Sequence, residues 1–180
     1  FCINLHDQRS IYAAGDTKLP AILSFLAPSY DQSKSINEFR QKAMTMIGSI
    51  YKGIKAKTNW SIGRYNDDFN INCFGDFFMS QNTPTILLEA GHHPNDFGRN
   101  IVVHEVYKSL LMLLNLFVCE NQIKSNTETY FSIPKNYDHL RDIEITNIRS
   151  LSGLSNKLFV QFHEILKGDK IYFSPYIENE

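Results

Sequence analysis

Two short apolar runs in this sequence end in side chains that could carry out chemistry. Phe1 to Leu5 runs directly into His6 and Asp7, and Thr85 to Leu88 ends in Glu89. Both runs are typical of short strands buried on both faces. Catalytic and ligand-binding groups in open α/β sheets gather outside the carboxyl ends of strands. We therefore predict that the imidazole and the carboxylate lie on one edge of one sheet and border one cleft, although each residue alone could be an ordinary strand end.

Composition narrows the class of protein that these strands belong to. The chain has 180 residues, of which 43% are hydrophobic and 21% charged, which indicates one globular core with room for a small appendage. A net charge of -1 and a pI near 6.7 provide no electrostatic footprint for nucleic acid or an anionic membrane. The most apolar segment, residues 101–118, is interrupted by polar and charged side chains and is predicted to be a buried helix rather than a membrane span.

The cysteines argue against a disulfide framework. Cys2, Cys73 and Cys119 are odd in number and lack CxxC spacing. We predict buried free thiols, which favour a reducing compartment such as the cytoplasm.

The elements that would position the two strand ends can be read along the first two thirds of the chain. A short apolar run at Ala21 to Leu26 predicts a third strand, and a capping box at Ser35 and Glu38 predicts a helix that continues to Ile54. Residues 59–82 are aromatic, rich in Asn and Asp, and without a clean period, which indicates a long loop that forms part of a site. A second helix, capped by Asn95 or Asp96, should follow.

The character of the sequence changes after Cys119. A polar linker leads into short alternating runs punctuated by Gly, Pro, Asn and Asp, which predict strands. We therefore divide the chain into an α/β part at residues 1–121 and a small β-rich, sandwich-like module at residues 126–180, which could be truncated.

Three segments together resemble the C-terminal half of the catalytic domain of a zinc metallocarboxypeptidase of the carboxypeptidase A-like superfamily, close to its bacterial members. They are "INLHDQR", "IGRYNDDFNINCFGDFF" and "TPTILLEAGH", and the match extends from about Phe1 to Phe117. The resemblance implies a three-layer mixed-sheet fold and a metalloprotease that hydrolyses C-terminal peptide bonds. A deacylase of the aspartoacylase or succinylglutamate desuccinylase type, acting on a small N-acyl substrate, shares the same zinc chemistry and is an alternative.

The resemblance assigns roles to individual residues. His6 matches the family's late zinc ligand, and Glu89 matches its general base. A catalytic zinc with three protein ligands lowers the pKa of its water to about 7, and the base takes that proton and passes it to the leaving amine. Tyr65 is the nearest candidate for the family's flexible-loop tyrosine, and Asp7 is a candidate to orient the His6 ring.

Several charged and histidine residues have competing explanations. Arg9 and Arg64 could bind a substrate carboxylate through a bidentate fork, or could equally be solvated or paired with acidic residues of the 59–82 loop. His92 and His93 follow the base directly, but neighbours in an extended chain point to opposite sides. We predict that these histidines line the rim of the site.

The sequence also departs from the family pattern. The first two zinc ligands, an HxxE pair, are absent, because His104 and Glu105 fit neither that motif nor HExxH. The upstream asparagine and arginines that hold the substrate carboxylate are absent as well. With residue 1 already inside an apparent strand, we interpret the chain as a fragment or processed product whose partner is the N-terminal half of the same domain. A non-catalytic module, whose exposed strand needs a partner chain to cover it, is the third possibility.

Overall fold

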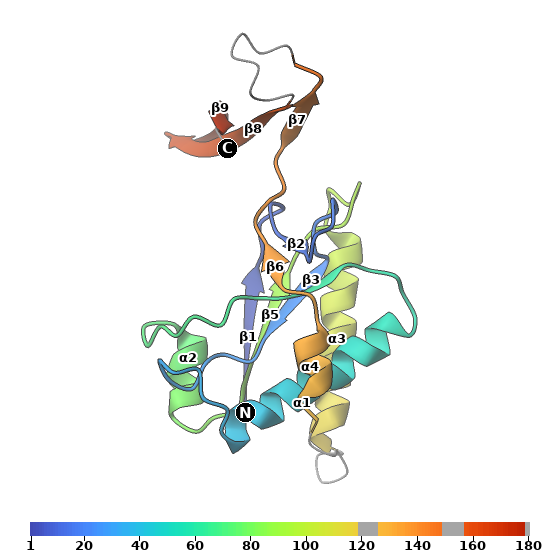
Figure 1. The fold of residues 1–180 in the computed structure, drawn as a ribbon, viewed down its shortest axis with the longest axis vertical. Helices are drawn as coiled ribbons and strands as arrows, with labels where there is room; N and C mark the ends of the chain where they lie inside the picture. The colour runs from blue at the N-terminus through green and yellow to red at the C-terminus, as the bar shows by residue number, and fades with distance from the viewer. Residues whose placement is uncertain (119–125, 149–156, 179–180) are drawn as a thin grey trace. The chain divides into compact units, whose positions relative to one another are not determined.

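The computed structural model describes residues 1–118, 126–148 and 157–178 (Figure 1). The chain divides into a first unit, Phe1–Asp138, and a second unit, His139–Glu180. The described elements of the first unit are β1 (Cys2–Asp7), β2 (Ala13–Ala14), β3 (Leu23–Leu26), α1 (Glu38–Lys55), β4 (Ile62–Arg64), α2 (Phe74–Ser80), β5 (Thr85–Ala90), α3 (Asn100–Val118), α4 (Glu128–Ser132) and β6 (Asn136–Tyr137). Those of the second unit are β7 (Ile143–Thr146), β8 (Lys157–Lys167) and β9 (Lys170–Glu178).

The first unit is built on a four-stranded mixed sheet in the order β1-β5-β3-β4. β1 runs parallel to β5, β5 antiparallel to β3, and β3 parallel to β4. The predicted α/β class and mixed sheet are confirmed, as are the two predicted strands, Cys2–Asp7 and Thr85–Ala90. Only β5 is buried as predicted, whereas β1 is half-buried to exposed because it has a neighbouring strand on one side only. β1 is an edge strand of this sheet.

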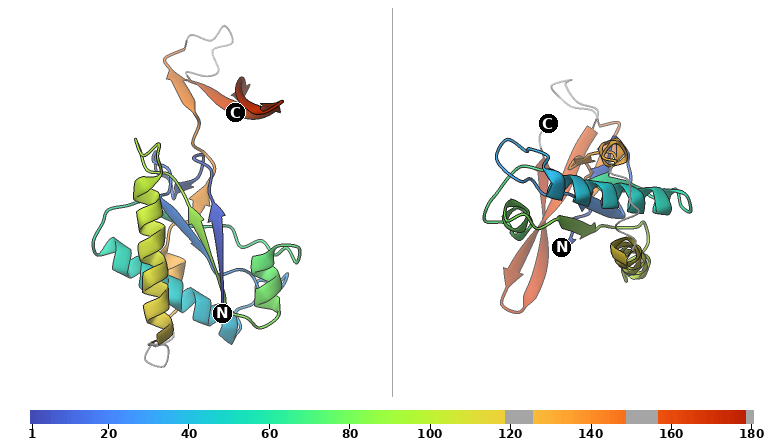
Figure 2. Two further views of the ribbon diagram at one scale, coloured as in Figure 1. Left: turned by 180° about the vertical axis from the view of Figure 1, so that it is seen from behind. Right: turned by 90° about the horizontal axis from the view of Figure 1, so that it is seen from below.

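Helices flank the central strands on both sides. α2 packs against β1 and β5, whereas α3 packs against β5 and β3, and the two helices lie on opposite sides of the β1–β5 pair (Figures 1 and 2). α1 packs against β5, α3 and α4 and contributes much of the core through Ala43, Met44, Met46, Ile47 and Ile50.

The predicted start of α1 was wrong by two residues. Asn37 is the N-cap, and its side-chain oxygen accepts a hydrogen bond from the Arg40 backbone N–H at 2.9 Å. Ser35 instead donates its hydroxyl to Asp31. An Asn at this position satisfies an orphan N–H as well as a serine does, so the capping box was not required.

Two further local predictions were wrong. The presumed long loop at 59–82 contains β4 and α2, which leaves residues 65–73 between them. Cys73 is exposed and Cys2 is half-buried, so the predicted burial of the thiols fails for Cys73, while Cys119 lies outside the described residues.

α3 is less buried than its apolar sequence predicted. One stripe, Val102, Glu105, Ser109 and Leu113, is buried, and the opposite face leaves apolar side chains exposed, namely Val103, Tyr107, Leu111, Leu114 and Val118. The reason is that α3 covers β3 and β5 along one side only. By length and composition alone α3 could cross a membrane, with 22% of its span buried in the structure, although the core helix of a soluble protein meets the same test.

The boundary between the two parts lies later in the chain than residues 122–125, where the sequence analysis placed it. α4 packs on α1, and the fully buried Tyr130 accepts a hydrogen bond from the Ala27 backbone N–H at 3.1 Å. β6 pairs with β2. Residues 126–138 therefore belong to the first unit, and a cut that preserves it must fall after Asp138.

The second unit is β-rich, as its alternating sequence predicted. Its described residues form a three-stranded antiparallel sheet in the order β7-β8-β9. Within that described part there is one sheet only, so the second layer of a sandwich is not seen there.

Candidate functional site

The register of the sheet brings the two predicted strand ends together. His6 of β1 lies directly opposite Glu89 of β5, and Glu89 in turn lies opposite Ser24 of β3. Residues that are paired across neighbouring strands point to the same face of a sheet. The imidazole and the carboxylate therefore share one face as well as the predicted edge. The common edge is confirmed, whereas the cleft between them stays a prediction.

The two side chains are close but differ in their environment. His6 Nδ1 lies 3.6 Å from Glu89 Oε1, and the exposed fractions of the two side chains are 47% and 6%. Nδ1 is thus the ring nitrogen on the Glu89 side. The pair combines an accessible imidazole with a carboxylate that is largely withdrawn from water.

Burial changes the proton affinity of Glu89. Desolvation raises the pKa of its carboxyl from the ordinary value of 4.5 to about 7, and the negative charge of Asp7 adds to the effect. A carboxyl with a pKa near 7 can accept and return a proton near neutral pH, which suits a general base.

We expect this raised pKa to appear in the pH dependence of stability. The folded chain binds the Glu89 proton more tightly than the unfolded chain, so Glu89 should lower stability as the pH rises from 4.5 through about 7. At about pH 8.5 the variant Glu89→Gln should be more stable than the wild type by on the order of 1–3 kcal/mol, and below about pH 4.5 this advantage should vanish. Urea denaturation followed by the fluorescence of Trp60 in the first unit measures the difference.

The matched control is Asp16→Asn, which neutralises an exposed carboxylate of the same unit. Its stability difference from the wild type should change little over the same pH range. An advantage of Glu89→Gln that is equal at both ends of the range would show that Glu89 does not carry a raised pKa.

Asp7 does not orient the His6 ring as the sequence analysis suggested. Its carboxylate accepts a hydrogen bond from Arg99 Nη2 at 2.6 Å, and the same nitrogen donates to the Ala90 carbonyl at 2.9 Å. Arg99 thus ties the end of β1 to the end of β5 and stabilises the edge at which His6 and Glu89 meet.

Tyr65 lines a cavity of the first unit and is close enough to Glu89 for the charge of that carboxylate to affect its pKa. Its hydroxyl is 3.5 Å from that of Tyr12, and burial, followed by Tyr12 and then the Glu89 charge, raises its pKa well above the ordinary value. The phenol therefore stays protonated and can donate a hydrogen bond.

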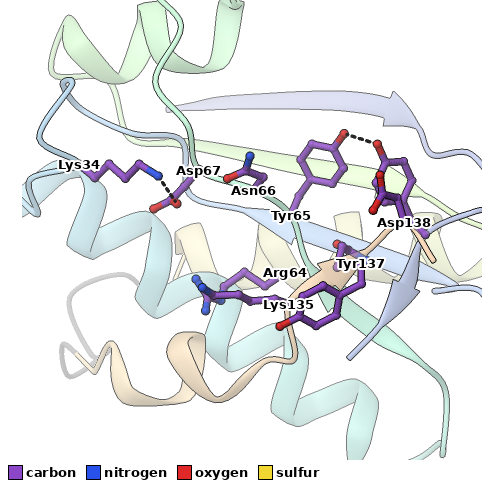
Figure 3. A pocket seen from close by; sticks show the side chains of 10 residues that line it. Lys34, Arg64, Tyr65, Asn66, Asp67, Lys135, Tyr137 and Asp138 are labelled. Carbon is purple, nitrogen blue, oxygen red and sulfur yellow. Dashed lines mark hydrogen bonds and ion pairs between the residues drawn. The ribbon is translucent and has the colours of Figure 1, made fainter. Parts of the chain in front are cut away.

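The cavity beside Tyr65, called the polar cavity below, has a volume of about 390 Å³ (Figure 3). Its lining is mostly polar and comes from four separate segments of the first unit: Tyr12, Lys34, Arg64, Tyr65, Asn66, Asp67, Lys135, Asn136, Tyr137 and Asp138. His6 and Glu89 are not among the residues that line it.

The two predicted arginines have different surroundings. Arg64 is buried, lines the polar cavity, and stacks on Tyr130 and Phe131 with its guanidinium carbon 5.3 and 5.4 Å from the ring centroids. Arg9 is exposed in the turn that follows β1 and is not among the cavity residues. The structure thus brings Arg64 and Tyr65 together at one cavity, whereas Arg9 does not line it.

Two acidic residues of segment 59–82, which the sequence analysis assigned to a loop, form hydrogen bonds that stabilise the local structure. Asp67 accepts a hydrogen bond from Arg40 at 2.7 Å, and Asp76 accepts backbone N–H groups of Ser29 and Asn70, both at 2.9 Å. Burial raises the pKa of Asp76 despite these bonds. The segment that supplies Tyr65 is therefore pinned to the loop after β3.

The adjacent histidines have separate environments. The His92 ring is half-buried, and burial, followed by the positive charge of Arg99, lowers its pKa. His93 Nδ1 lies 2.8 Å from the Pro94 carbonyl, and its ring packs edge-on against Trp60. Among the residues that the structure describes, no group of three His, Cys, Asp or Glu side chains is placed to hold a metal ion.

Sequence reasoning missed the residues of the polar cavity that come from the end of the first unit. Lys135 and Asn136 belong to a segment that was assigned to the β-rich module. Asn136 covers Gly63, where an added Cβ would lie 2.3 Å from its Nδ2, and this amide donates to the Ala13 carbonyl. The glycine in "SIGRY" was the one local signal of such a close approach.

The arrangement can supply one imidazole as a metal ligand, one poised carboxylate as a base and one neutral phenol as a hydrogen-bond donor. These are functions that hydrolysis of an amide requires, whereas one imidazole does not complete a zinc site. No protein-family model, no curated protein and no solved structure matches this chain.

Proposed function

We propose that this chain forms part of a zinc-dependent hydrolase of the metallocarboxypeptidase type, with Glu89 as the general base and His6 as one metal ligand. The observation that carries the proposal is the register pair of His6 and Glu89, whose side chains approach to 3.6 Å at one edge of the sheet. The raised pKa of Glu89 supports it, since a general base works best with a pKa near the operating pH.

In this proposal each residue has a distinct part. A bound zinc would supply a water whose pKa is lowered to about 7. Glu89 would be placed to accept a proton from such a water and return it to the leaving amine, a role that would keep it off the metal. Tyr65, held protonated by burial, donates a hydrogen bond to the substrate and positions it.

The described residues fit one of the three protein ligands that a catalytic zinc requires. In this proposal the other two ligands come from a segment outside the described residues. The edge position of β1 supports such a segment, because Phe1 and Leu5 are 43% and 53% exposed and an edge strand leaves one row of backbone groups unpaired. A further strand could pair there and place its ligands beside His6.

Metal analysis tests the ligand count. The 180-residue chain should bind no stoichiometric zinc and hydrolyse neither peptides nor N-acyl amino acids, whereas a longer form with an HxxE pair should bind one zinc and hydrolyse one of these two classes. Changing His6→Ala in the longer form should reduce zinc affinity by at least about 100-fold, because it removes one of three ligands.

The control is His104→Ala, which removes an exposed histidine of α3 and should leave zinc binding unchanged. Retention of zinc in the longer His6→Ala variant would remove His6 from the metal site. Stoichiometric zinc held through His6 in the 180-residue chain would show that the ligand count is wrong.

A further inference from the structure

We infer that the polar cavity is a binding site for a small carboxylate anion, held by Arg64 and Lys135. This inference does not rest on the proposed hydrolase function, since it requires no metal and, apart from Tyr65, concerns other side chains than that proposal. It rests on an arginine without a counter-ion, a second cation beside it and the charge balance of the cavity.

The first observation is that Arg64 is buried without an acidic partner. The residue is 9% exposed, and its Nε is buried with no hydrogen-bond acceptor in the described part of the chain. The aromatic rings of Tyr130 and Phe131 hold the guanidinium from the side, but a ring offers no acceptor oxygen for the N–H groups. Because a buried charge is normally paired, the free Nε indicates that an acceptor from outside the chain completes the site.

The second observation is that Lys135 lies next to Arg64. The two residues are paired through a parallel backbone bridge, and the Arg64 N–H donates to the neighbouring Pro134 carbonyl at 2.7 Å. Their side chains extend in the same direction along the cavity (Figure 3). No acidic partner of Lys135 is found within the described residues, so two like charges share one wall, and an anion placed between them would relieve the repulsion.

The charges of the whole cavity lining favour a ligand that carries one negative charge. The cavity is lined by three positive and two negative side chains, and Asp67 is already bonded to Lys34 at 3.3 Å and to Arg40 at 2.7 Å. Asp138 also lies on the wall and would repel a dianion. A carboxylate therefore fits better than a phosphate, and the planar fork of an arginine matches two carboxylate oxygens.

Neutral hydrogen-bond donors in the cavity lining can also contact the bound carboxylate. Tyr12 and Tyr65 line the same cavity with their hydroxyls 3.5 Å apart, and Asn66 adds an amide. A volume of about 390 Å³ accommodates a ligand of several carbon atoms, so the carboxylate can belong to a small organic acid or to an acidic group of a larger substrate.

Titration of the 180-residue chain with propionate, with neutral propionamide and with inorganic phosphate tests the inference. Amide NMR spectra at constant ionic strength should show saturable shifts for Arg64, Tyr65 and Lys135 with propionate. Propionamide should cause no such shifts, and phosphate should bind more weakly. Changing Lys135→Gln should weaken propionate binding by about tenfold, because one charge-assisted hydrogen bond is lost.

The matched control is Lys52→Gln, which removes an exposed cation of α1 away from the cavity lining and should bind propionate as the wild type does. Arg64→Lys keeps the charge and loses the fork, and should also bind more weakly if it remains folded. The inference is overturned if propionamide shifts the same amides, if Lys135→Gln binds propionate like the wild type, or if phosphate binds more tightly.

Discussion

Replacing Glu89 by Gln in a longer, zinc-loaded form of this protein should lower the rate of hydrolysis by about 10²- to 10⁴-fold while the zinc stays bound. Gln has nearly the same shape, but it cannot take a proton from water or return one to a leaving amine. Because Glu89 is 4% exposed and packed in the row between His6 and Ser24, the amide should occupy the same place. Single-turnover kinetics together with zinc analysis of the same sample would measure both effects.

Glu38→Gln is the matched control, since it makes the same chemical change at an exposed position at the start of α1. Its turnover should equal that of the wild type. A Glu89→Gln variant that remains fully active would show that Glu89 is only a strand end, and a variant that loses its zinc would place this carboxylate on the metal instead.

Changing Gly91→Ala should destabilise the first unit by more than about 3 kcal/mol, which is at the upper end of what one added methyl group costs in a packed interior. A Cβ at this position would lie 1.9 Å from the Ala21 carbonyl oxygen and 3.0 Å from that of Ile22. Both neighbours are backbone atoms, and the N–H groups of Gly91 and His92 donate to these same carbonyls at 2.9 Å. The strand must therefore move, and Glu89 moves with it.

Gly53→Ala provides the comparison for this prediction. There the atom that an added Cβ would meet is the terminal methyl of Met112, which can rotate away, and alanine is the better helix former. We expect its stability to remain within about 1 kcal/mol of the wild type. Urea denaturation followed by Trp60 fluorescence compares the two variants, and equal stability of both would contradict the close backbone approach at Gly91.

The strands that end in His6 and Glu89 could be predicted because their signal is local. A continuous apolar run entered through Pro84 and left through Gly91 fits a buried strand wherever it lies in the sheet. Their meeting at one edge followed from the rule for carboxyl ends of parallel strands, and the β1–β5 register obeys it.

α2 could not be predicted from hydrophobic periodicity because its pattern is reversed. Its buried positions are Gly75, Asp76 and Met79, whereas Phe74, Phe77 and Phe78 are exposed. Asp76 is buried because it bonds to the loop after β3, and only the tertiary structure supplies those partners. A search for apolar residues at helical spacing therefore finds the wrong face.

The place of Lys135 in the polar cavity could not be predicted for a similar reason. It lies beside β6, a strand of two residues whose partner β2 is more than a hundred residues earlier in the chain. So short a strand carries no periodic signal of its own. Its contribution to the polar cavity depends on the bridge to Arg64, which is likewise a contact between distant segments.

The contact between Tyr130 and Ala27 joins segments 103 residues apart. It can therefore form only late in the synthesis of the first unit. During synthesis, β1, β3, β4 and β5 are all made before α4 and β6. Residues 135–138, which form one wall of the polar cavity, are made last in this unit. Their contacts with the early strands close a long loop of chain, which is entropically slow. The strands that form the His6–Glu89 edge are therefore made before the final dozen residues of the first unit, which are needed to complete the cavity around Arg64.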